Sequence, residues 1–557
     1  MHEAYVSVYR LCYYRTSTSE DYGEMNKIAV YLNEHLLGEV SSAKSLRRKY
    51  ATDGSILNIA PEIIAFPRVT NDIRKIARFT WQLAEKGHIV GMTVRGFGGD
   101  VTGAAIGKGI VIDTSVQLGK ILQIAGKDKL VHTQPGASIA TINEALKWQG
   151  LSLPGGLRRN PKPITVGGAI ANDSFGVNGS ISDSIEKLEV VLANGDVIET
   201  GRIARRDVNK KLGLQTFEGE IYRKLEGLLE DNEELINKIT ADTTRDNTGY
   251  KRISDVRAKD GSFDLTPLFV GSQGTLGIIS EVVLKADFYS VDETHAVIVA
   301  DSIQTARDLS ERLGELEPAE LTIYDGTLFR RAAKQGSQFG LLGSVDQVGA
   351  VVYIRFNDFS ERAQSHKLKK LRKLLSKIGM GAVDSTERDP EEFRLITGIH
   401  QTLQLGASDE HITMPIIDGA SIPKNRREEF EIAVGELGAK HHLELPLELN
   451  ALNNTYNVYP ILKLETVGDK QKLFKLLADY AVVVDRCGGA VTADGAEGRL
   501  KATAAWAVLE DANAELYEQV RAIFDPFGTL NPGVKQKNEL RTLVAALRPS
   551  YDSSSVL

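Results

Sequence analysis

Cysteine is almost missing from this sequence, with only Cys12 and Cys487 among 557 residues. Because there is no CxxC pair, a cysteine-ligated zinc site, an iron–sulfur centre and a disulfide framework are excluded, and a reducing cytoplasm is indicated. No apolar run reaches the roughly 18 residues of a membrane span, so no transmembrane helix is predicted. The net charge is -7, which argues against a nucleic-acid partner, because binding to phosphates requires a basic surface.

What is present is typical of a globular protein with two or three domains, since 557 residues are too many for one core. Hydrophobic residues make up 42% of the chain and charged residues 25%. Residues 1–24 lack the positive start and apolar run of a signal peptide. Met25 precedes an amphipathic segment and is a second candidate start, so we assign residues 1–24 no function.

Hydrophobic periodicity predicts a mixture of helices and strands. Asn194-Gly195 between two β-branched runs predicts a hairpin, and residues 500–545 read as mostly helical. Helices are expected at Ile73–Lys86, Phe217–Ile239, Ile303–Leu313, Glu361–Ile378, Asn425–Leu437 and Asp469–Tyr480. Strands are expected at Ile89–Val94, Ile110–Asp113, His295–Ala300, Leu321–Tyr324, Ala350–Phe356 and Val458–Leu464.

The expected helix at Glu361–Ile378 places leucines on one face and cations on the other. The favoured interpretation is a solvated surface helix. The alternative is contact with the anionic lipid headgroups of a membrane.

A glycine-rich loop, Arg95-Gly96-Phe97-Gly98-Gly99-Asp100, joins two expected strands. Its glycines allow positive φ and expose consecutive N–H groups, which is typical of an anion site. Val101 and the strand that follows exclude the dinucleotide fingerprint, which opens a helix. A tight turn without a ligand is the alternative for this loop alone.

Two further glycine clusters lie beside apolar strand residues and suggest backbone pressed against a flat ligand. They are Thr165–Asn172, followed by Gly176 and Gly179, and Gly271–Ile278.

In this order, with Pro135–Ala137, Asn247–Tyr250 and Asp525–Gly533, these segments resemble the FAD-binding family of vanillyl-alcohol oxidase and p-cresol methylhydroxylase. Within it, the sequence is similar to the D-lactate dehydrogenase and glycolate oxidase branch. The resemblance covers about Tyr50 to Lys537 and implies an α+β fold with a two-subdomain FAD-binding domain, a substrate cap domain and C-terminal helices. The implied divisions are 1–44 (extension and helix), 45–285 (FAD domain), 286–500 (cap) and 501–557 (helices that return to the FAD domain).

The resemblance also implies a set of FAD-binding residues. Residues 94–103 contain no His or Cys with which some family members tether the flavin, so non-covalent FAD is expected. The implied FAD-binding residues are Arg95, Gly96, Phe97, Gly98, Gly99, Asp100, Thr165, Gly168, Asn172, Gly176, Gly179 and Asn531.

On the substrate side the family pattern is altered. The branch usually has histidines and an acid around a divalent metal, but here only Asn457 and Lys501 match. Tyr459 and Asp494 stand where a histidine and the acid would be, so no metal is expected. A tyrosine is a weak base unless a cation such as Lys501 or Arg499 lies near it. Packing of Tyr459 into the core is the alternative.

The sequence therefore predicts an enzyme that transfers hydride from a hydroxy acid or related alcohol to FAD, with Tyr459, Asn457, Asp494 and Lys501 as candidate catalytic residues. A sugar, aldonolactone or other alcohol as substrate, and a flavin-binding protein with a degenerate site, are the alternatives. The electron acceptor is a quinone, a carrier protein or oxygen. A homodimer, and peripheral contact of a cytoplasmic protein with the inner membrane face, are compatible with the sequence.

Overall fold

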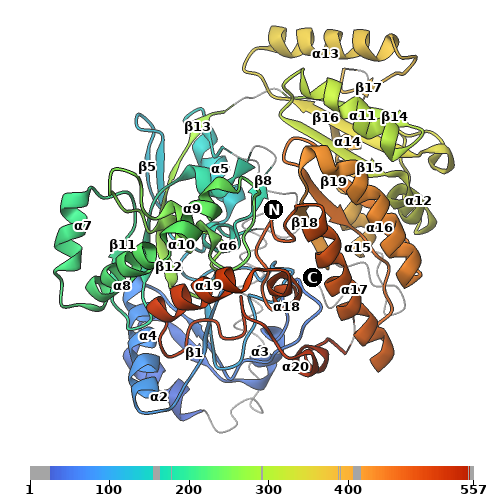
Figure 1. Cartoon of the computed structure of the whole chain (residues 1–557). Helices are drawn as coiled ribbons and strands as arrows, with labels where there is room; N and C mark the ends of the chain where they lie inside the picture. Colours follow the sequence, from blue (N-terminus) through green and yellow to red (C-terminus); the bar gives the residue numbers. More distant parts are fainter. Residues whose placement is uncertain are drawn as a thin grey trace.

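A computed structural model describes residues 26–154, 164–176, 179–289, 293–386, 388, 390–405, 415–549 and 551 (Figure 1). The extension over residues 1–24 lies outside this described part. Helices and strands are interspersed along the chain around three main sheets, which confirms the expected α+β class. None of the described helices combines the length and the apolar character that crossing a membrane requires.

The first sheet supports the glycine-rich loop. Its strand order is β1-β2-β4-β3, and β2 and β3 both run parallel to β4. Every residue of β2 and β4 is buried, as expected for parallel strands that are covered on both faces. Ile73 and Ile76 of one helix pack into the same core as Ile63 and Ile110. The elements are α2 (Lys27–His35), β1 (Glu39–Ser41), α3 (Lys44–Lys49), β2 (Ile63–Phe66), α4 (Thr70–Glu85), β3 (Met92–Arg95) and β4 (Ile110–Asp113).

The second sheet is antiparallel, with the order β11-β10-β12-β6-β5. The predicted hairpin is confirmed: Val190 lies opposite Ile198, and Gly195 turns with φ of 84°. The helix expected at Phe217–Ile239 is two helices that meet at Asn232. The elements are β5 (Ile121–Ala125), β6 (Leu130–Thr133), α5 (Ile139–Lys147), β7 (Leu151–Ser152), α6 (Val166–Asn172), β8 (Phe175–Gly176), β9 (Gly179–Ser180), β10 (Ile185–Val191), β11 (Val197–Glu199), α7 (Arg205–Leu212), α8 (Phe217–Asp231), α9 (Glu233–Ala241), α10 (Thr266–Phe269), β12 (Ile278–Lys285) and β13 (Asp287–Phe288).

The third sheet is antiparallel, with the order β17-β14-β16-β15-β19-β20-β18, and lies in the upper right of Figure 1. Alternate residues of its strands enter different cores, as the period of two requires. Val351 and Tyr353 pack with α12, α14 and α15, whereas Val352 and Ile354 pack with α11, α13, α16 and α17. The elements are β14 (Thr294–Ala300), α11 (Ile303–Gly314), β15 (Glu320–Asp325), α12 (Gly326–Lys334), β16 (Ala350–Phe356), α13 (Glu361–Ser376), β17 (Val383–Asp384), α14 (Pro390–Thr397), α15 (Ile399–Leu405), β18 (Ile417–Ser421), α16 (Arg427–His441), β19 (Leu447–Asn450), β20 (Thr455–Val458) and α17 (Val467–Arg486).

The strand expected at Val458–Leu464 is wrong. The strand ends at Val458, and one last bond, from the N–H of Tyr459 to the carbonyl of Pro446, extends its pairing with β19. Pro460 has no N–H to donate, so the ladder goes no further and Tyr459 stands at its end.

The last part of the chain returns to the first sheet. Met92 donates its N–H to Thr529 and accepts one from Asn531, so residues 529–531 lie beside β3. Leu530 is fully buried in the core of that sheet. The helices are α18 (Ala502–Ala507), α19 (Asp511–Phe524) and α20 (Leu540–Ala545).

Candidate active site

The glycine-rich loop leaves β3 with its backbone N–H groups unpaired. Within the described part of the chain, the N–H groups of residues 97–101 donate no hydrogen bond. Gly98 has φ of +74°, and a Cβ on Gly96 would lie 2.2 Å from the hydroxyl oxygen of Thr165. Glycine is therefore required at both positions, and the turn presents a row of donors suited to an anion.

The charged ends of the loop shape it. Arg95 turns back, donates to the carbonyl of Thr52 (2.7 Å) and lies over the ring of Tyr50. The Asp100 carboxylate accepts the N–H groups of Thr102 (2.9 Å) and Ala104 (2.8 Å). Burial, together with the nearby carboxylate of Asp53, raises the pKa of Asp100 to about 6. Arg95 does not line the cavity described below, and Asp100 does.

The start of α6 forms a second wall. Thr165 caps this helix by accepting the N–H of Gly168 (3.2 Å). At the other end, the side-chain oxygen of Asn172 accepts hydrogen bonds from Gln273 (3.0 Å) and the N–H of Ala496 (3.2 Å). Helix α6 thus joins the glycine-rich loops to residues 490–499, which we call the 490s segment.

One cavity runs between these walls and the third sheet. It is lined by eleven of the residues singled out in the sequence: Gly96, Phe97, Gly98, Gly99, Asp100, Thr165, Gly168, Asn172, Tyr459, Asp494 and Lys501. Among the described side chains, those of Arg95, Asn457 and Asn531 do not line it, and neither does Gly179; the prediction for Gly176 lies outside the side chains that the structure describes.

Asn531 supports the loop from behind. It adopts φ of +42° and is almost fully buried. Its side-chain amide donates to the carbonyls of Ala104 (2.9 Å) and Gln273 (2.7 Å), and its oxygen accepts the Thr93 hydroxyl (3.0 Å). It connects the end of the chain to two of the three glycine clusters.

On the third sheet, a buried ion pair faces the cavity. Lys501 Nζ lies 2.5 Å from Asp418 Oδ1 and 2.8 Å from the Asp418 carbonyl. Asp418 stands on β18 at an irregularity, where Gly419 takes φ of +76°. The side-chain oxygen of Asn457 accepts the Gly419 N–H (2.9 Å) and so holds this bulge. Asn457 therefore positions Asp418 from the neighbouring strand.

A second polar pair stands at the end of β20. The Tyr459 hydroxyl donates to Glu448 Oε2 at 2.7 Å. The ring of His400, on α15, lies nearly parallel to that of Tyr459, with centroids 6.3 Å apart, and also lines the cavity. Arg331 donates to the Tyr459 carbonyl (2.7 Å). Tyr459 therefore packs into a core, as the alternative interpretation of this residue predicted, and it also lines the cavity.

Asp494 lies beside the ion pair. Its N–H donates to the Gly419 carbonyl (3.0 Å), and Arg245 donates to the preceding carbonyl of Ala493 (2.6 Å). Arg499, the other candidate cation, is buried and donates to the carbonyls of Ile106 and Pro532 instead of the cavity. Across the described ranges, His, Cys, Asp and Glu side chains nowhere gather in threes that could hold a metal ion.

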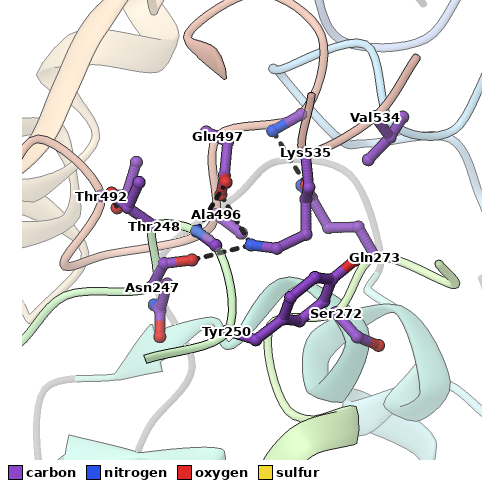
Figure 2. A network of polar contacts seen from close by, with 12 residues as sticks. Asn247, Thr248, Tyr250, Ser272, Gln273, Thr492, Ala496, Glu497, Val534 and Lys535 are labelled. Atoms are coloured by element: carbon purple, nitrogen blue, oxygen red, sulfur yellow. Dashed lines mark hydrogen bonds and ion pairs between the residues drawn. The ribbon is translucent and has the colours of Figure 1, made fainter. Parts of the chain in front are cut away.

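Behind the wall, a fully buried ion pair joins three segments (Figure 2). Lys535 Nζ lies 2.7 Å from Glu497 Oε2 and donates to the carbonyl of Asn247 (2.7 Å). Glu497 Oε1 accepts from the N–H of Gly249 (2.8 Å) and the indole of Trp506 (3.0 Å). The pair fixes the 490s segment, and with it Asp494 and Lys501, against residues 247–249 and the end of the chain.

Sequence reasoning missed Asp418 and Glu448 and set His400 aside. None belongs to a motif. Asp418 and His400 line the cavity themselves, and Glu448 is joined to it through Tyr459 at the end of the neighbouring strand. The one local signal is the Asp418-Gly419 dipeptide inside an apolar strand, which is typical of a bulge.

A cavity that joins a glycine-lined loop suited to an anion to a wall of polar side chains is a typical cofactor site. Comparison with known families agrees: residues 61–201 match the model of an FAD-binding domain, and residues 293–534 match that of the C-terminal domain of FAD-linked oxidases. The chain thus carries both the FAD-binding domain and the C-terminal domain of the FAD-linked oxidases.

Similar proteins support this assignment. The chain is 23% identical over 545 residues to D-2-hydroxyglutarate dehydrogenase of Pantoea ananatis, covering 92% of this chain and 52% of that protein. It is 23% identical over 502 residues to glycolate oxidase subunit GlcD of Bacillus subtilis, covering 88% of this chain and 92% of that protein. The chain thus spans about half the length of the Pantoea protein.

The structures agree in fold. The 4-ethylphenol oxidase from Gulosibacter chungangensis matches with a TM-score of 0.66 at 12% identity, over 95% of this chain and 99% of that one. The p-cresol methylhydroxylase with substrate bound matches with the same score and coverage.

The residues present fit FAD, the cofactor of this family. Among the described residues, the N–H groups of residues 97–101 are unpaired and suit a diphosphate. Gly96 has no side chain, and its backbone packs closely against Thr165, so this part of the wall is flat. The cavity continues past the loop to the polar cap wall. One long ligand can therefore place its diphosphate at the glycine-rich loop and its ring at the other end of the cavity.

The raised pKa of Asp100 predicts a pH-dependent affinity for FAD. Above about pH 6 this carboxylate is ionised and repels a diphosphate on the same loop, whereas below it the group is neutral. FAD should therefore bind more tightly as the pH falls through 6. Asp100→Asn, which retains an acceptor for Thr102 and Ala104, should bind FAD roughly tenfold more tightly at pH 8 and lose the dependence. Fluorescence titration of the apoprotein measures both; an unchanged pH profile in Asp100→Asn would exclude this carboxylate.

Proposed function

We propose that this chain is an FAD-dependent dehydrogenase or oxidase that converts the CH–OH group of a hydroxy acid to a carbonyl. The observation that carries the proposal is the single cavity that joins the glycine loops to Lys501–Asp418 and Tyr459–Glu448. The names of the hydroxy acid dehydrogenases and the glycolate oxidase subunit that the chain resembles point to the same class of substrate.

For the flavin, we propose non-covalent binding with the diphosphate on residues 96–100 and the ring toward the cap wall. Thr165, Gly168 and Asn172 border the same space. When bound, FAD accepts the hydride removed from the substrate carbon. Arg95, Gly179 and Asn531, which lie off the cavity, contribute by shaping the backbone around it, and Gly176 stays among the proposed FAD-binding residues. Residues 45–285 with 501–557 form the flavin domain in this proposal, and 286–500 the cap.

The hydroxyl proton needs an acceptor. The Tyr459 hydroxyl donates its own proton to Glu448, and Tyr459 lines the cavity, so we assign to its oxygen the proton of the substrate. When the substrate O–H bond breaks, Tyr459 takes that proton and passes its own to Glu448, so the tyrosine ends as it began and the glutamate is protonated. A carboxylate at the end of the relay overcomes the weakness of a phenol as a base.

Lys501 holds the substrate oxygen. Its ammonium group has three N–H donors, and Asp418 takes two through its carboxylate and carbonyl. The third can donate to the oxygen on which negative charge develops. Asn457, through Gly419, keeps Asp418 in place, and Asp494 borders the same part of the cavity.

A different alcohol is the second candidate. The family histidines are absent at positions 457–459 and 494–495, which favours a sugar, an aldonolactone or another alcohol that needs no metal. A flavin-binding protein without catalysis is the third, since an altered cap wall is compatible with an intact flavin wall. As electron acceptor a quinone, a carrier protein or oxygen fits the proposed reaction, and a homodimer is compatible with it.

Anaerobic reduction tests the proposal. The purified protein should show flavin absorbance, and acid precipitation should release the flavin into the supernatant. Two-hydroxy acids added without oxygen should bleach the spectrum, whereas bleaching only by sugars or aldonolactones would select the second candidate. Flavin that no hydroxy acid, sugar or alcohol bleaches would select the third.

A further inference from the structure

The outer face of α13 carries only cations and a histidine. The exposed side chains Arg362, His366, Lys369, Lys370, Lys373 and Lys377 follow the helix and its C-terminal extension. At about 100° per residue they fall within a stripe roughly 100° wide. The buried residues Gln364, Leu368, Leu371 and Leu375 are centred on the opposite side, so this cationic stripe points straight away from the core.

These cations lack partners. In the part of the chain that the structure describes, no carboxylate forms an ion pair with Arg362, Lys369, Lys370, Lys373 or Lys377. The two cations that flank the stripe are the ones that are paired: Lys367 with Asp358 and Arg372 with Asp384. The whole chain has a net charge of -7, so the stripe is a local reversal of sign and not part of a basic protein.

Exposed aromatic rings adjoin the stripe. Phe359, directly before α13, is 71% exposed and meets Phe288 of β13, 59% exposed, edge-to-face with centroids 6.4 Å apart. Lys129 Nζ lies 3.6 Å from the centroid of Phe288. Trp148, which is 92% exposed, lies shortly before Leu151 of β7, and β7 is the strand paired with β13. The contact between Phe288 and Phe359 makes a small continuous apolar patch beside the start of α13, and such patches mark interaction sites where single exposed rings do not.

We propose that this surface docks on an anionic lipid membrane. Lysines and arginines gain from the negative surface potential of a bilayer, and aromatic rings gain by entering the boundary between headgroups and acyl chains. A nucleic acid would satisfy the cations alone, and the acidic remainder of the chain would repel it over any longer contact. Figure 1 shows α13 at the outer edge of the molecule, where it can meet a flat surface. The proposal goes beyond the proposed reaction and does not depend on it.

Vesicle sedimentation with the full chain tests the surface. It should bind vesicles of phosphatidylglycerol and phosphatidylcholine in equal parts, bind phosphatidylcholine vesicles far less, and release at high salt. The triple variant Lys369→Glu/Lys370→Glu/Lys373→Glu should bind the mixed vesicles roughly a hundredfold more weakly, since each basic residue near an anionic leaflet contributes about a factor of five. Its flavin absorbance should be unchanged, because these side chains point away from the core.

A matched variant controls for net charge. Lys463, Lys472 and Lys475 are exposed near or on α17, and changing all three to Glu makes the same change in charge. This variant should bind as the unmodified protein does. Equal loss in both variants, equal binding to neutral vesicles, or tighter binding to duplex DNA than to mixed vesicles would each overturn the proposal.

Discussion

Replacing Lys535 by methionine is expected to destabilise the folded protein by about 3–5 kcal/mol, because it leaves the Glu497 carboxylate buried without its cation. Both side chains of this pair are fully buried. Burial lowers the pKa of Lys535, and the neighbouring Glu497 opposes that shift, so the lysine depends on its partner to stay charged. Chemical unfolding followed by far-ultraviolet circular dichroism and flavin release measures the loss.

Two variants show whether the charge pair is the cause. Glu497→Gln/Lys535→Met should recover much of the loss, since glutamine still accepts from Gly249 and Trp506 and no charge stays buried. Lys238→Met removes a lysine from an exposed pair with Glu510 and should cost at most about 1 kcal/mol. A Lys535→Met variant as stable as Lys238→Met would show that the pair does not hold the 490s segment.

The elements predicted best from sequence are those whose partners lie nearby or that are apolar throughout. The strands at Ile110–Asp113 and Ala350–Phe356 have the bounds that their apolar runs indicated. The hairpin at Asn194-Gly195 needs only its own turn residues. The strand expected at Val458–Leu464 failed because its apolar residues are buried for another reason: after Pro460, Leu462 forms a single bridge and Leu464 lies in a loop, and both pack into the core.

The two walls of the cavity also differ in how well they could be predicted from the sequence. The wall at the glycine-rich loop is formed by backbone geometry, and glycines such as Gly96 and Gly98 indicate that geometry in the sequence. The wall at the third sheet is formed by pairs of side chains, and no sequence pattern indicates which side chains pair. Lys501 was singled out, but its partner Asp418 is 83 residues away. Only the folded sheet brings β18 beside β20 and turns the bulge toward the cavity.

Replacing Tyr459 by phenylalanine is expected to slow anaerobic flavin reduction by roughly 10²–10⁴-fold, the usual contribution of a positioned acid–base group. The substitution removes only the hydroxyl that donates to Glu448 and keeps the ring that packs beside His400. Flavin content should therefore stay the same, and substrate affinity should change much less than the rate. Stopped-flow reduction at saturating substrate measures the rate directly.

Glu448→Gln and Tyr353→Phe separate the relay from a general effect of lost hydrogen bonds. An amide at position 448 cannot take the proton, so the rate of flavin reduction in Glu448→Gln should fall in the same direction as that of Tyr459→Phe. Tyr353 is a buried tyrosine of the same sheet that bonds to His295 and lies off the cavity, so its phenylalanine variant should reduce flavin at the normal rate. An unchanged rate in Tyr459→Phe would contradict the relay but not the flavin chemistry. The proton would then go to another group of the cavity. Asp418 is the next candidate because it lines the same cavity.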